Sequence, residues 1–205
     1  MKFAYFNPTT IAVDDIPADK FSLFKSMVDQ AHQFNDKNDA GNPKISIRGG
    51  QQIQLLPNEF GMDVSILKQY VESRCQEYID TVMKQASKND LQGYQPMMIS
   101  AWTIRQASGD YQAMHSHEAH LSGNIYIEAP DLADPNAPSD AKIEFRFPTI
   151  RNSATFTFID QWRFSPQPMK MLVFPSYLPH CVYPWKGSGT RTILAWDCRL
   201  IAKKA

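Results

Sequence analysis

The segment KMLVFPSYLPHCVYPWKGSGTRTILAW, residues 170–196, holds two apolar runs that are rich in β-branched and aromatic residues. Proline, glycine and serine separate the runs, and residues of these types commonly bound strands. Earlier in the chain lie similar runs, MMISAWTIRQA, LSGNIYIEA, KIEFRF and ATFTFID, and the final run continues through DCRL. Short strands at regular spacing with turn residues between them predict a sandwich, barrel or jelly roll.

Two helical patterns precede these strands. Residues 16–34 repeat apolar side chains at helical spacing after a Pro-Ala-Asp opening that suits a helix start, and residues 64–85 carry a second apolar stripe among charged residues. We therefore predict a mainly β single domain with N-terminal helices. Residues 1–96 would form a helical and irregular support, and residues 97–205 would form the core.

The connection APDLADPNAPSDA, residues 129–141, contains three prolines and several aspartates, so it is not expected to form a strand. It is longer than most hairpin loops. Two interpretations stay open for it, a lid over a site and a solvated excursion.

Composition excludes several classes of protein. Lys plus Arg and Asp plus Glu number 21 each, so no basic field indicates nucleic acid. No apolar window is long enough for a membrane span or a secretion signal. The three cysteines are far apart and form no CxxC motif, which favours a reducing, cytoplasmic setting. Aromatic residues around Trp162, Phe164 and Trp185 could cover a partner surface, so a homo-oligomer is possible.

Three of the five histidines fall within MHSHEAH, residues 114–120. On a strand, residues two apart point to the same face, so His115 and His117 would lie side by side while Ser116 points away. Two imidazoles on one strand need only a third ligand from elsewhere to bind a transition metal. His180 is the candidate for that third ligand. A pair at this spacing is also common among histidines that bind no metal, so the motif alone is weak.

Arg191 follows His180 by eleven positions and begins the last apolar run. An arginine that lines a cavity needs an anionic partner, because an unpaired buried charge is costly. Its guanidinium matches a carboxylate through two parallel hydrogen bonds, so a small dicarboxylate or keto acid is a natural ligand. The competing interpretation is a surface arginine, or one paired with a protein acid such as Asp197 or Asp160.

Taken together, GDYQAMHSHEAHLSGNIYIEAP, KIEFRFP and KMLVFPSYLPHCVYPWKGSGTRTILAW resemble the iron(II)/2-oxoglutarate-dependent oxygenase superfamily. More narrowly, the H-x-H motif and the FPS-x-x-PH stretch are similar to a small group of oxygenases found in marine bacteria and phages. The resemblance covers roughly residues 100–200. It implies a double-stranded β-helix, or jelly-roll, core that holds Fe(II) at one end.

Carried over by position, the resemblance implies that His115 and His180 bind iron and that Arg191 pairs with the far carboxylate of 2-oxoglutarate. Most of the superfamily has H-x-D or H-x-E, so His117 stands where a carboxylate is usual. Three neutral imidazoles would leave the iron one charge more positive. Either His117 binds the metal, or Glu118 replaces it if a bulge turns Glu118 inward; strand phase favours His117.

Further residues can be assigned to the co-substrate pocket more loosely. Asn124 and Tyr126 lie at even spacing on the strand after the H-x-H motif, and Trp102 lies on the strand before it. We expect these three to contact 2-oxoglutarate or line its pocket, although ordinary packing in the core explains each equally well.

The leading functional hypothesis is an oxygenase that uses Fe(II), O₂ and 2-oxoglutarate, releases succinate and CO₂, and hydroxylates an unidentified substrate. A rival keeps the three histidines without 2-oxoglutarate, as a zinc hydratase or hydrolase or a cupin-type dioxygenase, and leaves Arg191 without a role. A third hypothesis is a non-catalytic jelly-roll binding protein. A filled cavity, or histidines that lack partners for their second ring nitrogen, would support the third.

Overall fold

The computed structural model describes residues 9–38, 47–48, 50–57, 61–86, 93–147 and 161–203. The run ATFTFID, expected to form a strand, lies outside these ranges. The elements in chain order are β1 (Ala12–Asp15), α1 (Ala18–Asn38), β2 (Ile47–Arg48), β3 (Gln51–Leu56), α2 (Ser65–Ala86), β4 (Tyr94–Gln106), β5 (Tyr111–His115), β6 (Leu121–Glu128), β7 (Asp131–Leu132), β8 (Ile143–Arg146), β9 (Gln161–Phe164), β10 (Lys170–Pro175), β11 (His180–Val182), β12 (Gly187–Ser188) and β13 (Arg191–Ala202).

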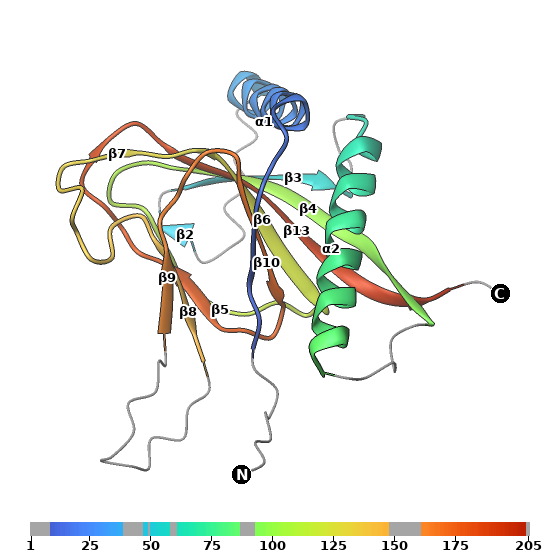
Figure 1. The fold of residues 1–205 in the computed structure, drawn as a ribbon. Coiled ribbons are helices and arrows are strands. Elements are labelled where there is room, and N and C mark those ends of the chain that lie inside the picture. Colours follow the sequence, from blue (N-terminus) through green and yellow to red (C-terminus); the bar gives the residue numbers. More distant parts are fainter. Residues whose placement is uncertain are drawn as a thin grey trace, which may run out of the picture.

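The strands form two larger sheets that face each other (Figure 1). The large sheet has the order β1-β10-β6-β13-β4-β3, and the smaller sheet has the order β2-β5-β11-β8-β9. Every pairing between these strands is antiparallel. The predicted mainly β fold with a jelly-roll core and N-terminal helices is confirmed.

Both predicted helices form, and local chemistry explains where they begin. Pro17 directly precedes α1, where its fixed φ angle suits a helix start, and Asp19 lies in the first turn near the positive end of the helix dipole. Before α2, the Asp63 carboxylate accepts a hydrogen bond from the Ser65 amide at 2.8 Å, which lowers the pKa of Asp63. Helix α1 continues to Asn38, four residues beyond the predicted end.

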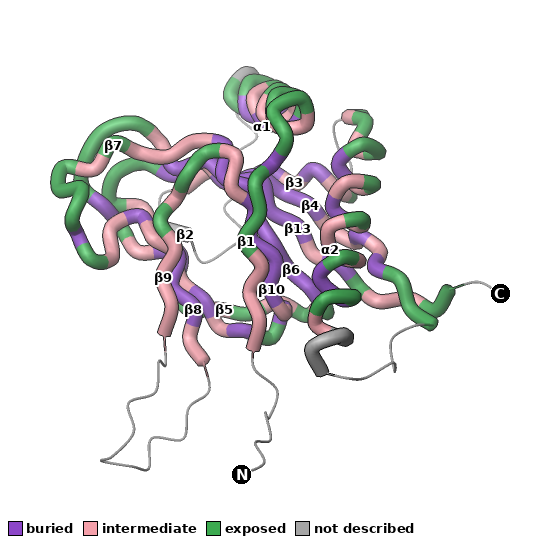
Figure 2. The backbone as a smooth tube through the Cα atoms, in the orientation of Figure 1, coloured by how far each residue is buried: buried purple, intermediate pink, exposed green. Residues whose placement is uncertain are grey.

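Two hydrophobic clusters divide the interior, as the buried positions in Figure 2 indicate. One joins both helices to the outer face of the large sheet, with Phe24, Val71 and Trp196 among its members. The other fills the space between the two sheets, with Phe145 and Ile193 among its members. The helices thus cover one face of the large sheet and leave its other face to the interior of the jelly roll.

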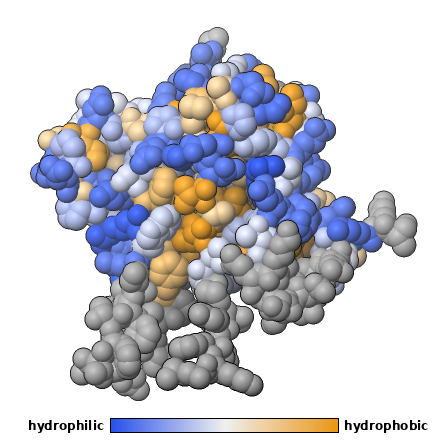
Figure 3. All heavy atoms as spheres, in the orientation of Figure 1, coloured by the Kyte–Doolittle hydropathy of each residue, from blue (hydrophilic) through white to orange (hydrophobic). Residues whose placement is uncertain are grey.

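The surface differs from the sequence prediction at one point. Trp185, expected with Trp162 and Phe164 on an exposed aromatic surface, is only 2% exposed, and the other two are half-buried against the core between the sheets. Figure 3 shows hydrophobic side chains gathered near the middle of the face seen in Figure 1, surrounded by hydrophilic ones. Neither described helix has the length and apolar character needed to cross a membrane.

The connection between β6 and β8 contains a two-residue strand, β7, which pairs with β12. The Lys142 ammonium donates to the backbone carbonyl of Ala137 at 2.9 Å, and Ala141 is fully buried. The expectation that residues 129–141 form no strand is therefore wrong at Asp131–Leu132, and the rest of this loop has no strand or helix and contacts the protein through Ala141 and Lys142.

Candidate metal centre

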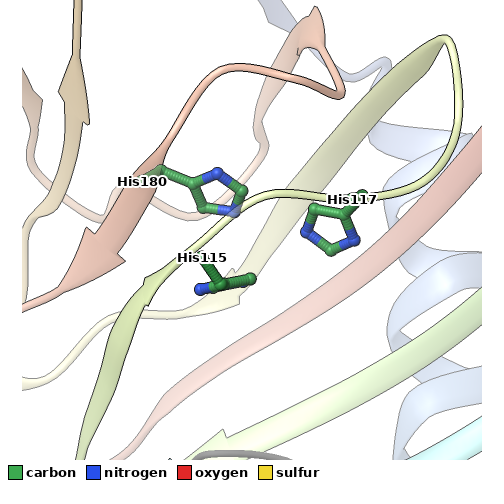
Figure 4. Close-up of side chains that lie close together, drawn as sticks. All are labelled: His115, His117 and His180. Atoms are coloured by element: carbon green, nitrogen blue, oxygen red, sulfur yellow. The ribbon is translucent and has the colours of Figure 1, made fainter.

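His115, His117 and His180 form a cluster in which one ring nitrogen from each residue lies within 4.8 Å of the others (Figure 4). The rings of His117 and His180 are nearly parallel, with centroids 5.2 Å apart, and the His115 and His180 centroids are 4.3 Å apart. His180 is 4% exposed, and the other two are half-buried. Among the described residues, this is the one group of three or more metal-ligating side chains close enough to share an ion.

Strand pairing brings two of these histidines together. His115 ends β5 and His180 begins β11, and the two residues are direct partners across that pair of strands. His117 lies beyond the end of β5, so the predicted strand geometry does not hold for it. Instead, its backbone amide donates to the carbonyl of Ser176 at 2.9 Å, which fixes this segment against the turn between β10 and β11.

Contacts with backbone carbonyls orient the rings of His115 and His180. The Nδ1 atoms of His115 and His180 lie 2.7 Å and 3.0 Å from the carbonyl oxygens of Ala113 and Leu178. If Nδ1 donates in each case, the Nε2 lone pair is free for a metal. Burial lowers the pKa of His115, and burial together with the neighbouring His115 lowers that of His180 to about 3. Both rings are therefore neutral at pH 7, as metal ligation requires.

The third histidine has a carboxylate partner. Nδ1 of His117 lies 3.3 Å from Oδ2 of Asp197, and the ring also stacks on Trp102 at a centroid distance of 5.6 Å. Sequence reasoning named Asp197 as a possible partner for Arg191, and that interpretation is wrong. Asp197 lies near one end of the cavity wall formed by β13, whereas Arg191 begins the strand.

A cavity of about 310 Å³ opens beside the histidines. The volume is within the range of small-molecule pockets. Most of the wall residues on β4 and β13 alternate along their strand, as the two-residue period requires, while Gly123 and Trp196 also reach the cavity out of that phase. The lining includes the three histidines together with Gln52, Trp102, Ile104, Gln112, Ser122, Asn124, Ile143, Phe174, Arg191, Ile193 and Ala195.

Arg191 is fully buried in the wall of this cavity. Its Nη1 donates to Oε1 of Gln106 at 2.8 Å, while its Nε and Nη2 have no hydrogen-bond partner in the described part of the protein. Burial lowers the pKa of Arg191, and its guanidinium lies 5.4 Å from the centre of the Tyr126 ring. No ion pair involves Arg191 among the described residues, so its charge is left for a ligand.

The other predicted pocket residues fall into two groups. Trp102 and Asn124 line the cavity, and the Asn124 amide nitrogen has no partner among the described residues. Tyr126 is fully buried beside Arg191 but outside the lining, and its hydroxyl is likewise unpaired within the described ranges. Glu118, the alternative to His117, is exposed and lies outside the metal-ligating cluster.

Sequence reasoning missed two contributors, Gln106 and the Ser122 hydroxyl. Gln106 has the same strand phase as Trp102, so alternation along β4 could have placed it on the cavity side. Ser122 has the same phase as Asn124 on β6, but its contact with Asp197 depends on the pairing of β6 with β13, which the sequence does not show.

The site fits a divalent metal and a small keto acid. Because Nδ1 of each ring faces a protein oxygen, the three Nε2 atoms are left to bind a metal such as iron, zinc or nickel. The buried donors of Arg191, Tyr126 and Asn124 without partners suit the carboxylate of an anionic ligand. No acid of the described residues pairs with Arg191, and Asp160, the other acid considered as its partner, lies outside the described ranges. A carboxylate from outside would complete this part of the cavity.

Residues 100–197 match a family described as "Putative 2OG-Fe(II) oxygenase". No curated protein matches the chain significantly. A prolyl-4-hydroxylase from Pseudomonas putida superposes with a TM-score of 0.57 at 15% identity, covering 93% of each chain. The viral collagen prolyl hydroxylase of Paramecium Bursaria Chlorella virus-1, in complex with 2-oxoglutarate, gives 0.55 at 14% identity, covering 92% of this chain and 96% of its own.

A third similar structure is HygX from Streptomyces hygroscopicus, solved with nickel and 2-oxoglutarate bound. It has a TM-score of 0.52 and 12% identity, and the match covers 93% of this chain and 82% of HygX. At such identities these structures show that the fold is shared, while the family match covers the residues that include all three histidines and Arg191.

Proposed function

We infer that this protein is a 2OG-Fe(II) oxygenase, the family whose model its residues 100–197 match, and propose that it hydroxylates a substrate still to be identified. The cofactors of that family are non-haem iron and 2-oxoglutarate. The observation that carries the proposal is the combination, in one cavity, of three metal-ligating imidazoles and a buried arginine that has no acidic partner within the described ranges. Iron with 2-oxoglutarate would supply the oxidising chemistry, and succinate and CO₂ would be the co-products.

We propose that His115, His117 and His180 bind the iron. Their Nδ1 atoms are engaged by Ala113, Asp197 and Leu178, which supports Nε2 as the ligating atom in each ring. Three ligands on one side of a metal leave positions for a chelating keto acid and for oxygen. The exposure of Glu118 supports His117 as the third ligand.

We propose that Arg191 binds the far carboxylate of 2-oxoglutarate, with Asn124 and Tyr126 as further donors. Gln106 holds one arm of the guanidinium and leaves Nε and Nη2 for the ligand. The apolar side chains of Ile193 and Ile104, which are partners across β13 and β4, line the cavity next to Arg191, and an apolar wall strengthens charge pairing.

These features argue against the two alternatives. A zinc hydratase or hydrolase gives Arg191 no role, although its burial is costly without an anion. A non-catalytic jelly roll explains neither the open cavity of about 310 Å³ nor the protein oxygen that faces Nδ1 of each of the three rings. We further propose that the protein acts in the cytoplasm, where its three free cysteines would stay reduced.

The test is an anaerobic titration of metal-stripped protein with Fe(II), with and without 2-oxoglutarate. A visible metal-to-ligand charge-transfer band that needs both components, and that fades with formation of succinate when oxygen is admitted, would support the oxygenase. Binding of iron without this band would point to chemistry that does not use a keto acid.

A further inference from the structure

We propose that Asp197 is a positioning residue that orients His117 through Nδ1 and supplies to the metal site the negative charge of a missing carboxylate ligand. The inference rests on the proposed function, because it takes the three histidines as the iron ligands. It accounts for the H-x-H motif, in which a neutral residue stands where oxygenases of this type usually have an acid.

His117 differs from the other two histidines in what its second nitrogen meets. The Nδ1 atoms of His115 and His180 face neutral backbone carbonyls, whereas Nδ1 of His117 faces Oδ2 of Asp197 at 3.3 Å. The side chains of His117 and Asp197 are 17% and 15% exposed, so solvent screens their interaction only partly.

The Asp197 carboxylate is itself held in place. The Ser122 hydroxyl lies 2.6 Å from its Oδ1, and the same hydroxyl lies 2.8 Å from that of Ser176. Ser122 is the backbone partner of Asp197 across β6 and β13. Ser176 also accepts the His117 amide through its carbonyl, so one turn fixes both the backbone of His117 and the partner of its ring.

A carboxylate that accepts from Nδ1 of a ligating imidazole fixes the ring and makes the metal-binding nitrogen a stronger donor. Three neutral imidazoles with one such carboxylate carry the same total charge as two imidazoles with a ligating carboxylate. Here that charge lies one hydrogen bond further from the metal. The site therefore retains the charge of the common ligand set while presenting three nitrogen atoms.

The first experiment compares Asp197→Asn with the wild type in metal-stripped protein. Fe(II) affinity is measured anaerobically by competition with a chromophoric chelator, so the readout does not depend on turnover. We expect affinity to fall about 10- to 100-fold, the usual effect of removing such a partner. Glu128→Gln is the matched control, because Glu128 also lies on the large sheet. Its carboxylate accepts hydrogen bonds from the hydroxyls of Thr190 at 2.6 Å and Thr192 at 2.7 Å. This substitution removes the same charge and should leave affinity unchanged.

The second experiment repeats Asp197→Asn in a His117→Asp background. In this background the imidazole that Asp197 would orient is absent, and the ligand set already contains a carboxylate. Asp197→Asn should therefore lower Fe(II) affinity much less in this background than in the wild type. A purely structural role for Asp197 predicts equal losses in both backgrounds, and that result would overturn the inference. A fall in the melting temperature of the metal-free variant leaves the comparison valid, since it affects both backgrounds.

His115→Ala and His180→Ala separate this inference from the proposed function. If both retain wild-type Fe(II) affinity, the metal centre itself is wrongly placed. If both lose the metal and Asp197→Asn does not change affinity, the metal centre stands and only the role of Asp197 is refuted.

Discussion

Replacing Arg191 tests the co-substrate assignment most directly, because its side chain is fully buried and two of its donors have no hydrogen-bond partner in the described part of the chain. Removing one partner of a desolvated charge pair costs about 2–5 kcal/mol. At roughly 1.4 kcal/mol for each factor of ten, Arg191→Met should weaken 2-oxoglutarate binding by about 30-fold to several thousand-fold. The three histidines remain, so Fe(II) affinity should not change.

Although it should weaken 2-oxoglutarate binding, the same substitution should not destabilise the ligand-free protein. Without ligand, Arg191 is a buried charge whose partners among the described residues, the Gln106 amide and the Tyr126 side chain, are neutral. Replacement of a buried charge by an apolar side chain of similar volume is often neutral or stabilising. We expect Arg191→Met to melt at a higher temperature than the wild type in the absence of 2-oxoglutarate, and to gain nothing when the keto acid is added.

Isothermal titration calorimetry, carried out anaerobically on Fe(II)-loaded protein, measures the affinity for 2-oxoglutarate. Arg105→Ala is the control, because Arg105 is next to Gln106 on β4 but has a 31% exposed side chain near Asp36. It should bind 2-oxoglutarate as the wild type does. If Arg191→Met also binds it with unchanged affinity, the arginine does not hold the co-substrate.

Three further substitutions test other parts of the cavity and the fold. Gln106→Glu would give Arg191 an internal carboxylate, so melting temperature should rise while 2-oxoglutarate affinity falls by about 1.5–3 kcal/mol in titration calorimetry. Gly123→Ala would place a methyl group against the Trp196 ring and a backbone carbonyl, and should destabilise the protein by ~1–3 kcal/mol in urea unfolding. Burial lowers the pKa of His32, so its contribution to stability is complete above about pH 6.5 and declines as pH falls toward the folded-state pKa. Urea midpoints between pH 7.5 and 5 should therefore depend less on pH in His32→Gln than in the wild type.

Strand periodicity was the most informative part of the sequence. It placed Trp102, Asn124 and Arg191 on the cavity side of three strands that meet in the folded protein. Each of these placements needs only the two-residue alternation within one strand. The prediction that His115 and His117 share a strand failed, since β5 ends at His115, yet both rings reach the same site.

The contacts that the sequence did not reveal depend on pairing between distant segments. The Ser176 carbonyl binds the His117 amide, and the His120 carbonyl accepts from the Ser176 amide at 3.2 Å. These bonds join a loop after β5 to a turn after β10. No local pattern encodes such a bond, because its geometry follows from the register of strands that lie far apart in the sequence.

Alternation along β13 also explains how the charges of Arg191 and Asp197 are placed. Arg191 and Asp197 are six residues apart, so both point toward the interior of the jelly roll, and at ~3.3 Å per residue they are separated by about 20 Å along the strand. That distance is too great for the two charges to neutralise each other. The guanidinium therefore remains for an external carboxylate, and the Asp197 carboxylate remains for His117. One strand thus holds a cation at the end where we propose that the co-substrate binds and an anion beside the proposed metal ligand His117, so it could balance the charges of both ligands without an acid among the three histidines.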